Sequence, residues 1–236
     1  MQLIPHEIHI WAIHLAITPE KEQQYQSFLS TEEDARAKRF QSPLHRKRFI
    51  AAHGFLHQVI GLYLNQAPNQ IVFHYNHYKK PHLAENPLAL QFNMAHSHDL
   101  AVYAVTKKDA LGIDIEKMKK IDYEGISRRY FSKEEKKALS SLQDQEKLQA
   151  FYRLWSRKEA IMKSLGKGLT IPLSSFSVSI HNEIETILVE NKAWTLSPLF
   201  IQSDYASALA SEGDIETISF WQIFDHIPRK IKAMKL

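Results

Sequence analysis

The stretch Gly112-Ile113-Asp114-Ile115-Glu116 alternates two acidic residues with two β-branched apolar ones. This period of two is typical of a β-strand, in which residues i and i+2 face the same side. We therefore expect Ile113 and Ile115 to anchor the strand in a core, and Asp114 and Glu116 to share the opposite face. Two carboxylates so close repel each other unless a cation lies between them, and Mg²⁺ prefers hard oxygen ligands. The alternative is an edge strand with a solvated acidic face, which this motif alone does not exclude.

A second motif follows in the segment 155–163, which reads WSRKEAIMK. Residues four apart are neighbours on a helix, so Trp155, Glu159 and Lys163 fall on one stripe, which Phe151 extends. The stripe begins apolar and becomes charged at Glu159 and Lys163. Charges that continue a buried stripe are costly unless they are partnered, which favours a carboxylate and an ammonium at the rim of a site. A solvated Glu–Lys pair on the helix surface is the alternative.

The segments on either side of these motifs alternate between strand and helix patterns. Strands are expected at 7–17, 71–75, 89–94, 100–106 and 110–116, with short strands between 176 and 221. Helices are expected within 20–40, at 43–64 and over 123–165. Ser132 and Glu135 have the spacing of a capping box, and Gly166 with Gly168 is expected to end the last helix. This order predicts an α+β fold. A faint similarity between 48–61 and 153–166 fits two related halves.

Composition narrows the classes of protein to which the chain can belong. It has 236 residues, 44% of them hydrophobic and 24% charged, as in ordinary globular proteins. The absence of cysteine excludes disulfides and a cysteine nucleophile. No stretch approaches the roughly 20 apolar residues that span a bilayer, and no targeting segment is visible, so we expect a cytoplasmic protein with no membrane partner. The net charge of +4 suits an anionic partner.

Basic residues and histidines supply further candidates. The cluster Arg36, Lys38, Arg39, Arg46, Lys47 and Arg48 would suit a nucleotide phosphate or a nucleic-acid backbone. No RNA-recognition, zinc-finger or helix-turn-helix signature supports the second reading, so no nucleic-acid partner is expected. His96 directly follows an apolar strand, where it would be placed to donate a hydrogen bond to a phosphate oxygen. A structural role for this histidine is the alternative.

Taken in order, these segments resemble the 4′-phosphopantetheinyl transferase family, in its long type similar to the surfactin synthetase activator. The acidic strand and the W-x-x-K-E-A-x-x-K helix form a specific signature together, although neither does alone. The residues that carry the resemblance are RFIAA at 48–52, KP at 80–81, NMAHS at 93–97, GIDIE at 112–116, FSKEE at 131–135, WSRKEAIMK at 155–163 and GKGL at 166–169.

This resemblance implies a fold and an activity. The fold would be a pseudo-dimer of two similar α/β subdomains, residues 1–109 and 110–236, with coenzyme A and the active site in the cleft between them. The chain would be a monomeric, Mg²⁺-dependent holo-carrier-protein synthase, in which Mn²⁺ is a possible substitute. It would transfer the 4′-phosphopantetheine arm of coenzyme A to a serine of an acyl or peptidyl carrier protein and release adenosine 3′,5′-bisphosphate.

The resemblance also implies roles for individual residues. Asp114, Glu116 and Glu159 fall on the family's Mg²⁺-binding acids. Three residues match family positions at the phosphates of coenzyme A or at the reacting groups: Lys163, His96 and Lys80. At the nucleotide end, a basic position of the family is matched by Arg48 and, more loosely, by Arg36. We expect Glu159, Lys163 and His96 to be catalytic, with Glu159 the first choice to accept the serine proton.

The chain departs from the family at Lys79, where glycine commonly precedes Lys-Pro, at Ala95, where serine or threonine is frequent, and at His53 and Gly54. The segment 117–131 holds aromatic residues among basic ones; we expect part of a carrier-docking face there, or else the core of a helix pair.

Two rival functions remain on sequence grounds, a Mg²⁺-dependent phosphoesterase acting on a nucleotide-like substrate and a nucleotide- or RNA-binding module. The identity of the carrier and the direct or water-mediated role of Glu116 stay open.

Overall fold

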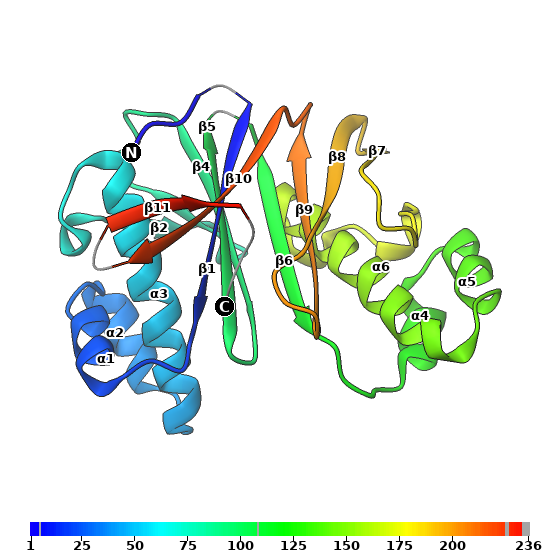
Figure 1. The fold of residues 1–236 in the computed structure, drawn as a ribbon, viewed down its shortest axis with the longest axis horizontal. Coiled ribbons are helices and arrows are strands. Elements are labelled where there is room, and N and C mark those ends of the chain that lie inside the picture. Colours follow the sequence, from blue (N-terminus) through cyan, green and yellow to red (C-terminus); the bar gives the residue numbers. More distant parts are fainter. Residues whose placement is uncertain (5, 108, 225–226, 233–236) are drawn as a thin grey trace.

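The computed structural model describes residues 1–4, 6–107, 109–224 and 227–232. Its two larger β-sheets lie side by side, each covered by helices on its outer side, so the molecule has two lobes (Figure 1). We call the part built on the first sheet the first lobe and the part built on the second sheet the second lobe. The mixed α+β class predicted from the sequence is confirmed.

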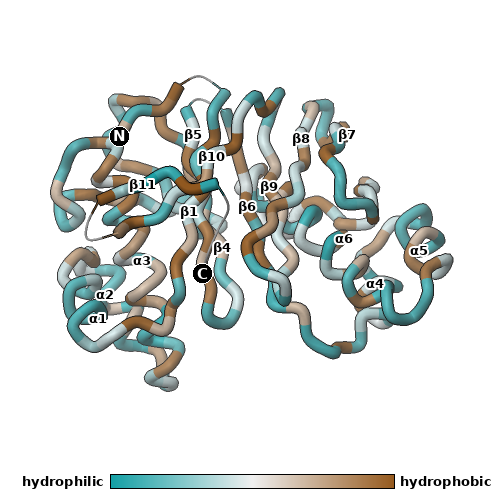
Figure 2. Tube along the Cα trace, viewed as in Figure 1, coloured by the Kyte–Doolittle hydropathy of each residue, from teal (hydrophilic) through white to brown (hydrophobic). Residues whose placement is uncertain are grey.

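The first sheet has the order β11-β10-β1-β5-β4. Its strands are β1 (Glu7–His14), β4 (Leu90–Ser97), β5 (Leu100–Lys107), β10 (Thr217–Phe224) and β11 (Ile227–Ile231). Three helices cover it, α1 (Pro19–Gln26), α2 (Thr31–Lys38) and α3 (Pro43–Leu64). Figure 2 shows that α1 and α2 are largely hydrophilic, whereas α3 carries many apolar residues, and these pack against the sheet in one core cluster.

The long helix α3 matches its sequence signals closely. It begins after Ser42, whose side chain accepts a hydrogen bond from the His45 amide, with Pro43 in the first turn. It ends at Asn65, which adopts the left-handed conformation that terminates many helices. The interval expected at 43–64 is therefore confirmed, whereas the region 20–40 forms two helices because Ser30 starts a new one with a capping box to Glu33.

The second sheet has the order β6-β9-β8-β7. Its strands are β6 (Leu111–Lys117), β7 (Glu185–Val189), β8 (Lys192–Leu199) and β9 (Tyr205–Glu212). Its helices are α4 (Tyr123–Tyr130), α5 (Lys133–Ser140) and α6 (Asp144–Leu165), and three short 3₁₀ turns lie at Pro68–Gln70, Gly168–Thr170 and Leu173–Ser175. A Cβ atom at Gly112 would lie 2.1 Å from the Ala160 carbonyl oxygen, so glycine at this position lets α6 lie directly against β6.

The two lobes meet where β4 lies beside β6. The Ile113 amide donates to the Asn93 side-chain oxygen across this junction, at 2.8 Å. Ile113 and Ile115 belong to an apolar cluster that also contains Ile10 and Val102 from the first sheet and Leu209 from the second. The orientation predicted for the GIDIE strand is thus confirmed, because its isoleucines anchor it in a core shared by both sheets.

A short hairpin, β2 (Phe73–Tyr75) with β3 (Pro81–Leu83), connects the first lobe to the end of α6. The Asn76 side chain donates to the Gly166 carbonyl at 3.0 Å. The Lys80 ammonium donates to the carbonyls of Leu111, Lys163 and Ser164 at 2.8–3.2 Å. Hydrogen bonds from one hairpin therefore fix the C-terminal end of α6, where free carbonyls need donors.

The end of the chain returns to the first sheet. β10 pairs with β1 in parallel, and β11 pairs with β10. The sequence predicts short strands in this region, but strand patterns do not state which sheet a strand joins. The division into similar halves 1–109 and 110–236 stays a prediction, and the pairing adds that residues 217–224 and 227–231 lie with the first sheet.

Candidate functional site

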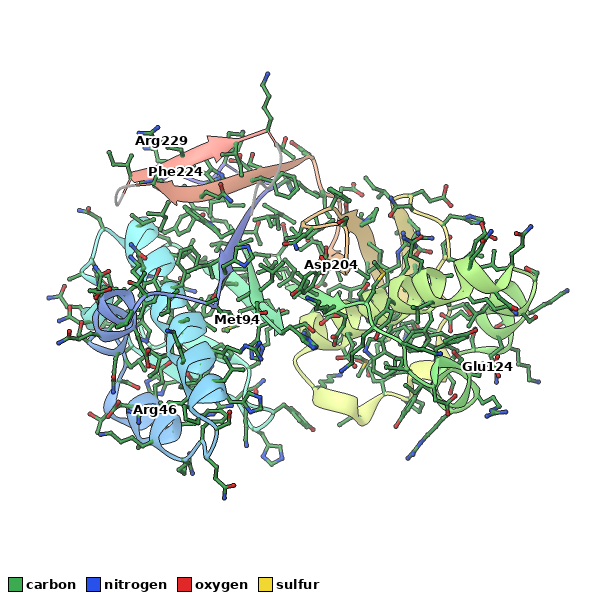
Figure 3. The ribbon with its side chains drawn as sticks, turned by 60° about the horizontal axis from the view of Figure 1, so that its bottom comes forward. Arg46, Met94, Glu124, Asp204, Phe224 and Arg229 are labelled. Atoms are coloured by element: carbon green, nitrogen blue, oxygen red, sulfur yellow. The ribbon has the colours of Figure 1, made fainter. Side chains whose placement is uncertain are left out.

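A cavity of about 360 Å³ opens between the two lobes, in the size range of small-molecule sites. Figure 3 places Met94, on β4 and in the cavity wall, between the lobes, whereas Arg46 and Glu124 lie out on the first and second lobes. The polar and charged side chains that line the cavity come from both lobes, and they include Arg36, His53, Tyr75, Lys80, Asn93, His96, Glu159 and Lys163.

Helix α6 supplies the second-lobe wall. Phe151 stacks on Trp155 with ring centroids 6.1 Å apart, and Phe151 is buried against Phe131. One and two turns further on, Glu159 and Lys163 line the cavity. The change from an apolar to a charged stripe, predicted from the sequence, marks the point where this face of α6 passes from the core to the cavity, while Ile161 on another face stays buried.

Strand β6 brings two carboxylates to the same region. Asp114 is 2% exposed, and its Oδ1 accepts a hydrogen bond from the Lys163 ammonium at 2.6 Å. Its Oδ2 is buried and has no hydrogen-bond partner among the described residues. Glu116 is less buried and accepts from the Ser97 hydroxyl at 2.9 Å. Asp114 therefore presents one oxygen with unused acceptor capacity beside a charged cavity wall.

Neighbouring carboxylates influence the ionisation of Glu159 and Glu116. Burial raises the pKa of Glu159, and the charge of Asp114 raises it further. Burial and Asp114 raise the pKa of Glu116 in the same way. Lys163 is also enclosed by protein, which lowers its pKa, but Asp114 outweighs this and keeps the ammonium charged. The repulsion expected from the D-x-E pair is thus present and extends to Glu159.

This donor set suits a hard divalent cation. All the candidate ligand atoms are carboxylate oxygens, and the buried Oδ2 of Asp114 lacks a partner. Over the described parts of the chain, no three or more His, Cys, Asp or Glu side chains are already gathered closely enough to enclose a metal ion. The cation next to Asp114 in this arrangement is the Lys163 ammonium.

Two further predicted residues lie in the cavity wall. The pKa of His96 is lowered by partial desolvation in the cavity wall and by the nearby charge of Lys163, although the side chain is exposed to the cavity, so it is neutral in this environment. Burial lowers the pKa of Lys80 to about 8. Since its ammonium already donates to three backbone carbonyls, Lys80 links the lobes as well as lining the cavity.

The two arginines predicted at the nucleotide end lie in different places. Arg36 lines the cavity and lies over the Phe49 ring, 5.1 Å from its centroid. Arg48 is not among the lining residues. It forms a 2.5 Å ion pair with Asp99, although its charge is near enough to lower the pKa of His96.

Several residues singled out from the sequence serve the fold. Tyr123, Tyr130 and Phe131 of the segment 117–131 pack in the core of the second lobe, as the alternative interpretation of that segment expects. Lys79 adopts a φ of 64°, a left-handed conformation that glycine adopts with less strain, which fits the glycine common in the family. Ala95 is buried and forms part of the cavity wall.

Sequence reasoning missed a polar cluster in the first-lobe wall. His53 and Tyr75 line the cavity, and both bond to the buried carboxylate of Glu33. His57, one turn beyond His53, bonds to the other oxygen of that carboxylate. The i,i+4 spacing of the two histidines in a largely apolar stretch of α3 was the available signal, since such residues need a polar partner when buried.

No helix in the described parts of the chain is long and apolar enough to cross a membrane.

Comparison with known proteins gives consistent matches. The family model described as the 4′-phosphopantetheinyl transferase superfamily matches residues 110–210. The chain is 34% identical over 224 residues to the 4′-phosphopantetheinyl transferase HetI of Nostoc sp., which covers 94% of both chains. It is 35% identical over 167 residues to the 4′-phosphopantetheinyl transferase Sfp of Bacillus subtilis, covering 71% of this chain and 73% of the relative. A second Bacillus subtilis relative, the 4′-phosphopantetheinyl transferase ffp, is 36% identical over the same shares.

Proposed function

Since the chain belongs to the 4′-phosphopantetheinyl transferase superfamily and transfers the phosphopantetheine arm of coenzyme A to a carrier protein, we propose that the cavity between its lobes is where this transfer takes place. The observation that carries the proposal is the convergence of Glu159, Lys163 and His96 on one cavity, with the unsatisfied Asp114 oxygen beside it. We propose that the cavity between the two lobes corresponds to the cleft of a pseudo-dimer.

Asp114, Glu159 and Glu116 are the residues that would hold Mg²⁺, and Mn²⁺ would fit the same oxygen ligands. When bound there, the ion would neutralise negative charge on the pyrophosphate of coenzyme A. Asp114 is the firmest candidate, because one of its oxygens is buried without a partner. Glu116 already accepts from Ser97 and would bind directly or through water.

The reaction forms a bond between the carrier serine oxygen and the β-phosphorus of coenzyme A. The bond from that phosphorus to the bridging oxygen breaks, and adenosine 3′,5′-bisphosphate leaves. We assign removal of the serine proton to Glu159, directly or through one water, because its raised pKa makes it a better proton acceptor than an ordinary carboxylate. Lys163 and His96 stabilise charge on the phosphate oxygens by hydrogen bonds.

Arg36, on the first-lobe wall, faces the nucleotide end of coenzyme A in this proposal, and Arg48 contributes its charge from just outside the cavity. Lys80, whose three N–H groups already donate to backbone carbonyls, holds the hairpin against α6 and attracts a phosphate of coenzyme A by its charge in this proposal. We further propose that the enzyme is a cytoplasmic monomer that accepts acyl or peptidyl carrier proteins. The excess of positive charge would steer an acidic carrier domain toward it.

Mass spectrometry of an apo carrier protein tests this proposal. The carrier is incubated with coenzyme A, Mg²⁺ and either the wild-type enzyme or the Glu159→Gln variant. We expect the carrier to gain one phosphopantetheine with the wild-type enzyme and none with the variant. Hydrolysis of coenzyme A in the absence of carrier would instead support a phosphoesterase, and full activity of the variant would contradict the placement of the reaction at Glu159.

A further inference from the structure

Glu33 is a buried carboxylate in the first-lobe wall, with only 3% of its surface exposed. Its Oε1 accepts hydrogen bonds from His53 Nδ1 at 3.1 Å and from the Tyr75 hydroxyl at 2.9 Å. Its Oε2 accepts from His57 Nε2 at 2.8 Å and from the Ser30 amide at 3.0 Å. Burial alone would raise the pKa of Glu33, but the hydrogen bonds from the two histidines outweigh it and keep the carboxylate ionised.

His57 neutralises this buried charge. Its Nε2 faces the Glu33 carboxylate, and its Nδ1 lies 3.0 Å from the Pro68 carbonyl oxygen. Both partners are acceptors, so both ring nitrogens must carry a proton, and His57 is an imidazolium. The buried Glu33–His57 pair therefore has no net charge, and it does not need a proton on both nitrogens of His53 to neutralise it.

His53 is held in one tautomer by the same carboxylate. Its Nδ1 carries the proton donated to Glu33, and its ring stacks on Phe49 with centroids 4.0 Å apart. Its Nε2 has no hydrogen-bond partner among the described residues, and the ring lines the cavity beside Arg36. This is the arrangement of a histidine–carboxylate pair that orients one nitrogen and leaves the other to act on a ligand.

The charged and titratable groups around His53 determine its protonation. Burial lowers the pKa of His53, Glu33 raises it, and Arg36 and His57 lower it further, so His53 is neutral when the cavity holds no anion. Tyr75 stays protonated, because burial and Glu33 both raise its pKa. His96 lies across the cavity wall, and a positive charge on His53 lowers its pKa. An arriving anion reverses this balance, since negative charge near Nε2 favours the imidazolium.

We infer that His53 binds the 3′-phosphate of coenzyme A and takes up a proton as the phosphate arrives, with Glu33 as the residue that positions it and stabilises its charge. This inference rests on the proposed function. The pyrophosphate is assigned to Lys163, His96 and the metal that the acidic residues would hold, so the ribose phosphate is the remaining anion for the wall formed by His53 and Arg36. His53 is thus a residue that distinguishes coenzyme A from its form without the 3′-phosphate.

Titration calorimetry measures this proton directly. Binding of coenzyme A and of 3′-dephospho-coenzyme A is measured at pH 8, where the free 3′-phosphate is already a dianion, in buffers with different ionisation enthalpies. We expect the wild-type enzyme to take up more protons, by up to about one per ligand, with coenzyme A than with the dephosphorylated form. The dephosphorylated form retains the pyrophosphate. Any proton that His96 takes up therefore contributes equally to both measurements and does not appear in their difference.

Two variants complete the experiment. His53→Gln should abolish the difference in proton uptake and weaken coenzyme A binding about tenfold, while its affinity for the dephosphorylated form stays unchanged. His45→Gln, an exposed histidine on the same helix, should behave as the wild type. Thermal melts show whether His53→Gln remains folded, and the comparison of the two ligands on the wild-type enzyme needs no variant.

The outcomes separate this inference from the function on which it rests. Equal proton uptake with both ligands on a wild-type enzyme that binds them, or undiminished extra uptake in His53→Gln, would overturn the role of His53 alone. A wild-type enzyme that binds neither ligand and leaves the carrier unmodified would overturn the proposed function as well.

Discussion

Two of the lysine–carboxylate pairs of helix α6 join it to other elements of the second lobe, and they differ in one respect. Lys158 is fully buried and donates to Glu135 and to the carbonyls of Leu173 and Phe176, at 2.7–2.8 Å. Glu135 in turn accepts from the amides of Ser132 and Val178. Every polar atom of this pair is therefore satisfied within the protein, and the pair ties α6 to α5 and to the loop that follows α6.

The second pair, Lys163 with Asp114, is incomplete. Lys163 is bonded to Asp114 Oδ1 at the cavity wall, while Oδ2 is buried with no partner among the described residues. Buried polar atoms are almost always paired in native proteins, and the open oxygen of Asp114 lies beside the cavity wall, which is why we propose that a ligand binds it. Of these two lysine–carboxylate pairs, the one with complete hydrogen bonds is structural, and the one with an open oxygen is the pair that we propose to be functional.

Loss of the acidic side of the cavity should have the largest effect. Glu159→Gln and Asp114→Ala are each expected to reduce carrier modification by about 10³-fold or more, above 4 kcal/mol of transition-state stabilisation, because the metal site and the proton acceptor are both affected. Steady-state rates at saturating Mg²⁺ measure this, with circular dichroism to show that the fold is kept. Near-normal turnover of either variant would remove its residue from the site.

Loss of the complete pair should affect stability rather than chemistry. Lys158→Met leaves Glu135 buried without its cation, and we expect the free energy of unfolding to fall by about 3–5 kcal/mol. Urea denaturation measures the loss. The matched control is Lys192→Met, whose exposed pair with Glu212 should contribute less than about 1 kcal/mol. Equal effects of the two substitutions would show that burial does not distinguish these pairs.

Loss of Lys163 should be intermediate in its effect on activity. Lys163→Met is expected to slow transfer about 10²-fold, because a donor to the phosphates is removed. The accompanying loss of stability should be restored by Mg²⁺, since a divalent cation can replace the ammonium next to Asp114. Lys167→Met, in an exposed pair with Glu190, serves as the control and should change neither quantity appreciably. A stability loss that Mg²⁺ fails to restore would contradict the metal assignment.

The smallest expected effect is a gain in stability, in contrast to the losses of activity and stability expected from the other substitutions. The raised pKa of Glu159 means that its ionised form destabilises the fold, fully so above the folded pKa and not at all once pH falls well below the ordinary value of 4.5. Without metal, Glu159→Gln should therefore raise the melting temperature by about 1–3 °C at pH 8. The gain should vanish near pH 4. A gain that persists unchanged at acid pH would have another cause.

Much of this architecture could be predicted from local sequence. Helix α3 was predictable because Ser42 and Pro43 mark its start and its apolar residues recur at helical spacing. The orientation of Asp114 and Glu116 followed from strand alternation, and the Ser132–Glu135 capping box is present. These features depend on neighbours in the chain, which the sequence displays directly.

What remained hidden depends on contacts between distant segments. The return of β10 to β1 follows from sheet pairing, which a strand pattern does not specify. The motif alone did not show that Lys158 faces the core while Glu159, its neighbour, faces the cavity. The buried cluster of Glu33, His53 and His57 joins two helices, and only their packing brings the three side chains together.

Equilibrium binding of Mn²⁺, followed by electron paramagnetic resonance in the presence of coenzyme A, tests the metal assignment most directly. The wild-type enzyme and Asp114→Asn are compared, with Asp204→Asn, a more exposed acid paired with Lys117, as the control. We expect the wild-type enzyme and the control to bind one ion with equal affinity and Asp114→Asn to bind it at least about tenfold more weakly. Binding by Asp114→Asn as tight as that of the wild-type enzyme would contradict the assignment of the open oxygen of Asp114 to the metal.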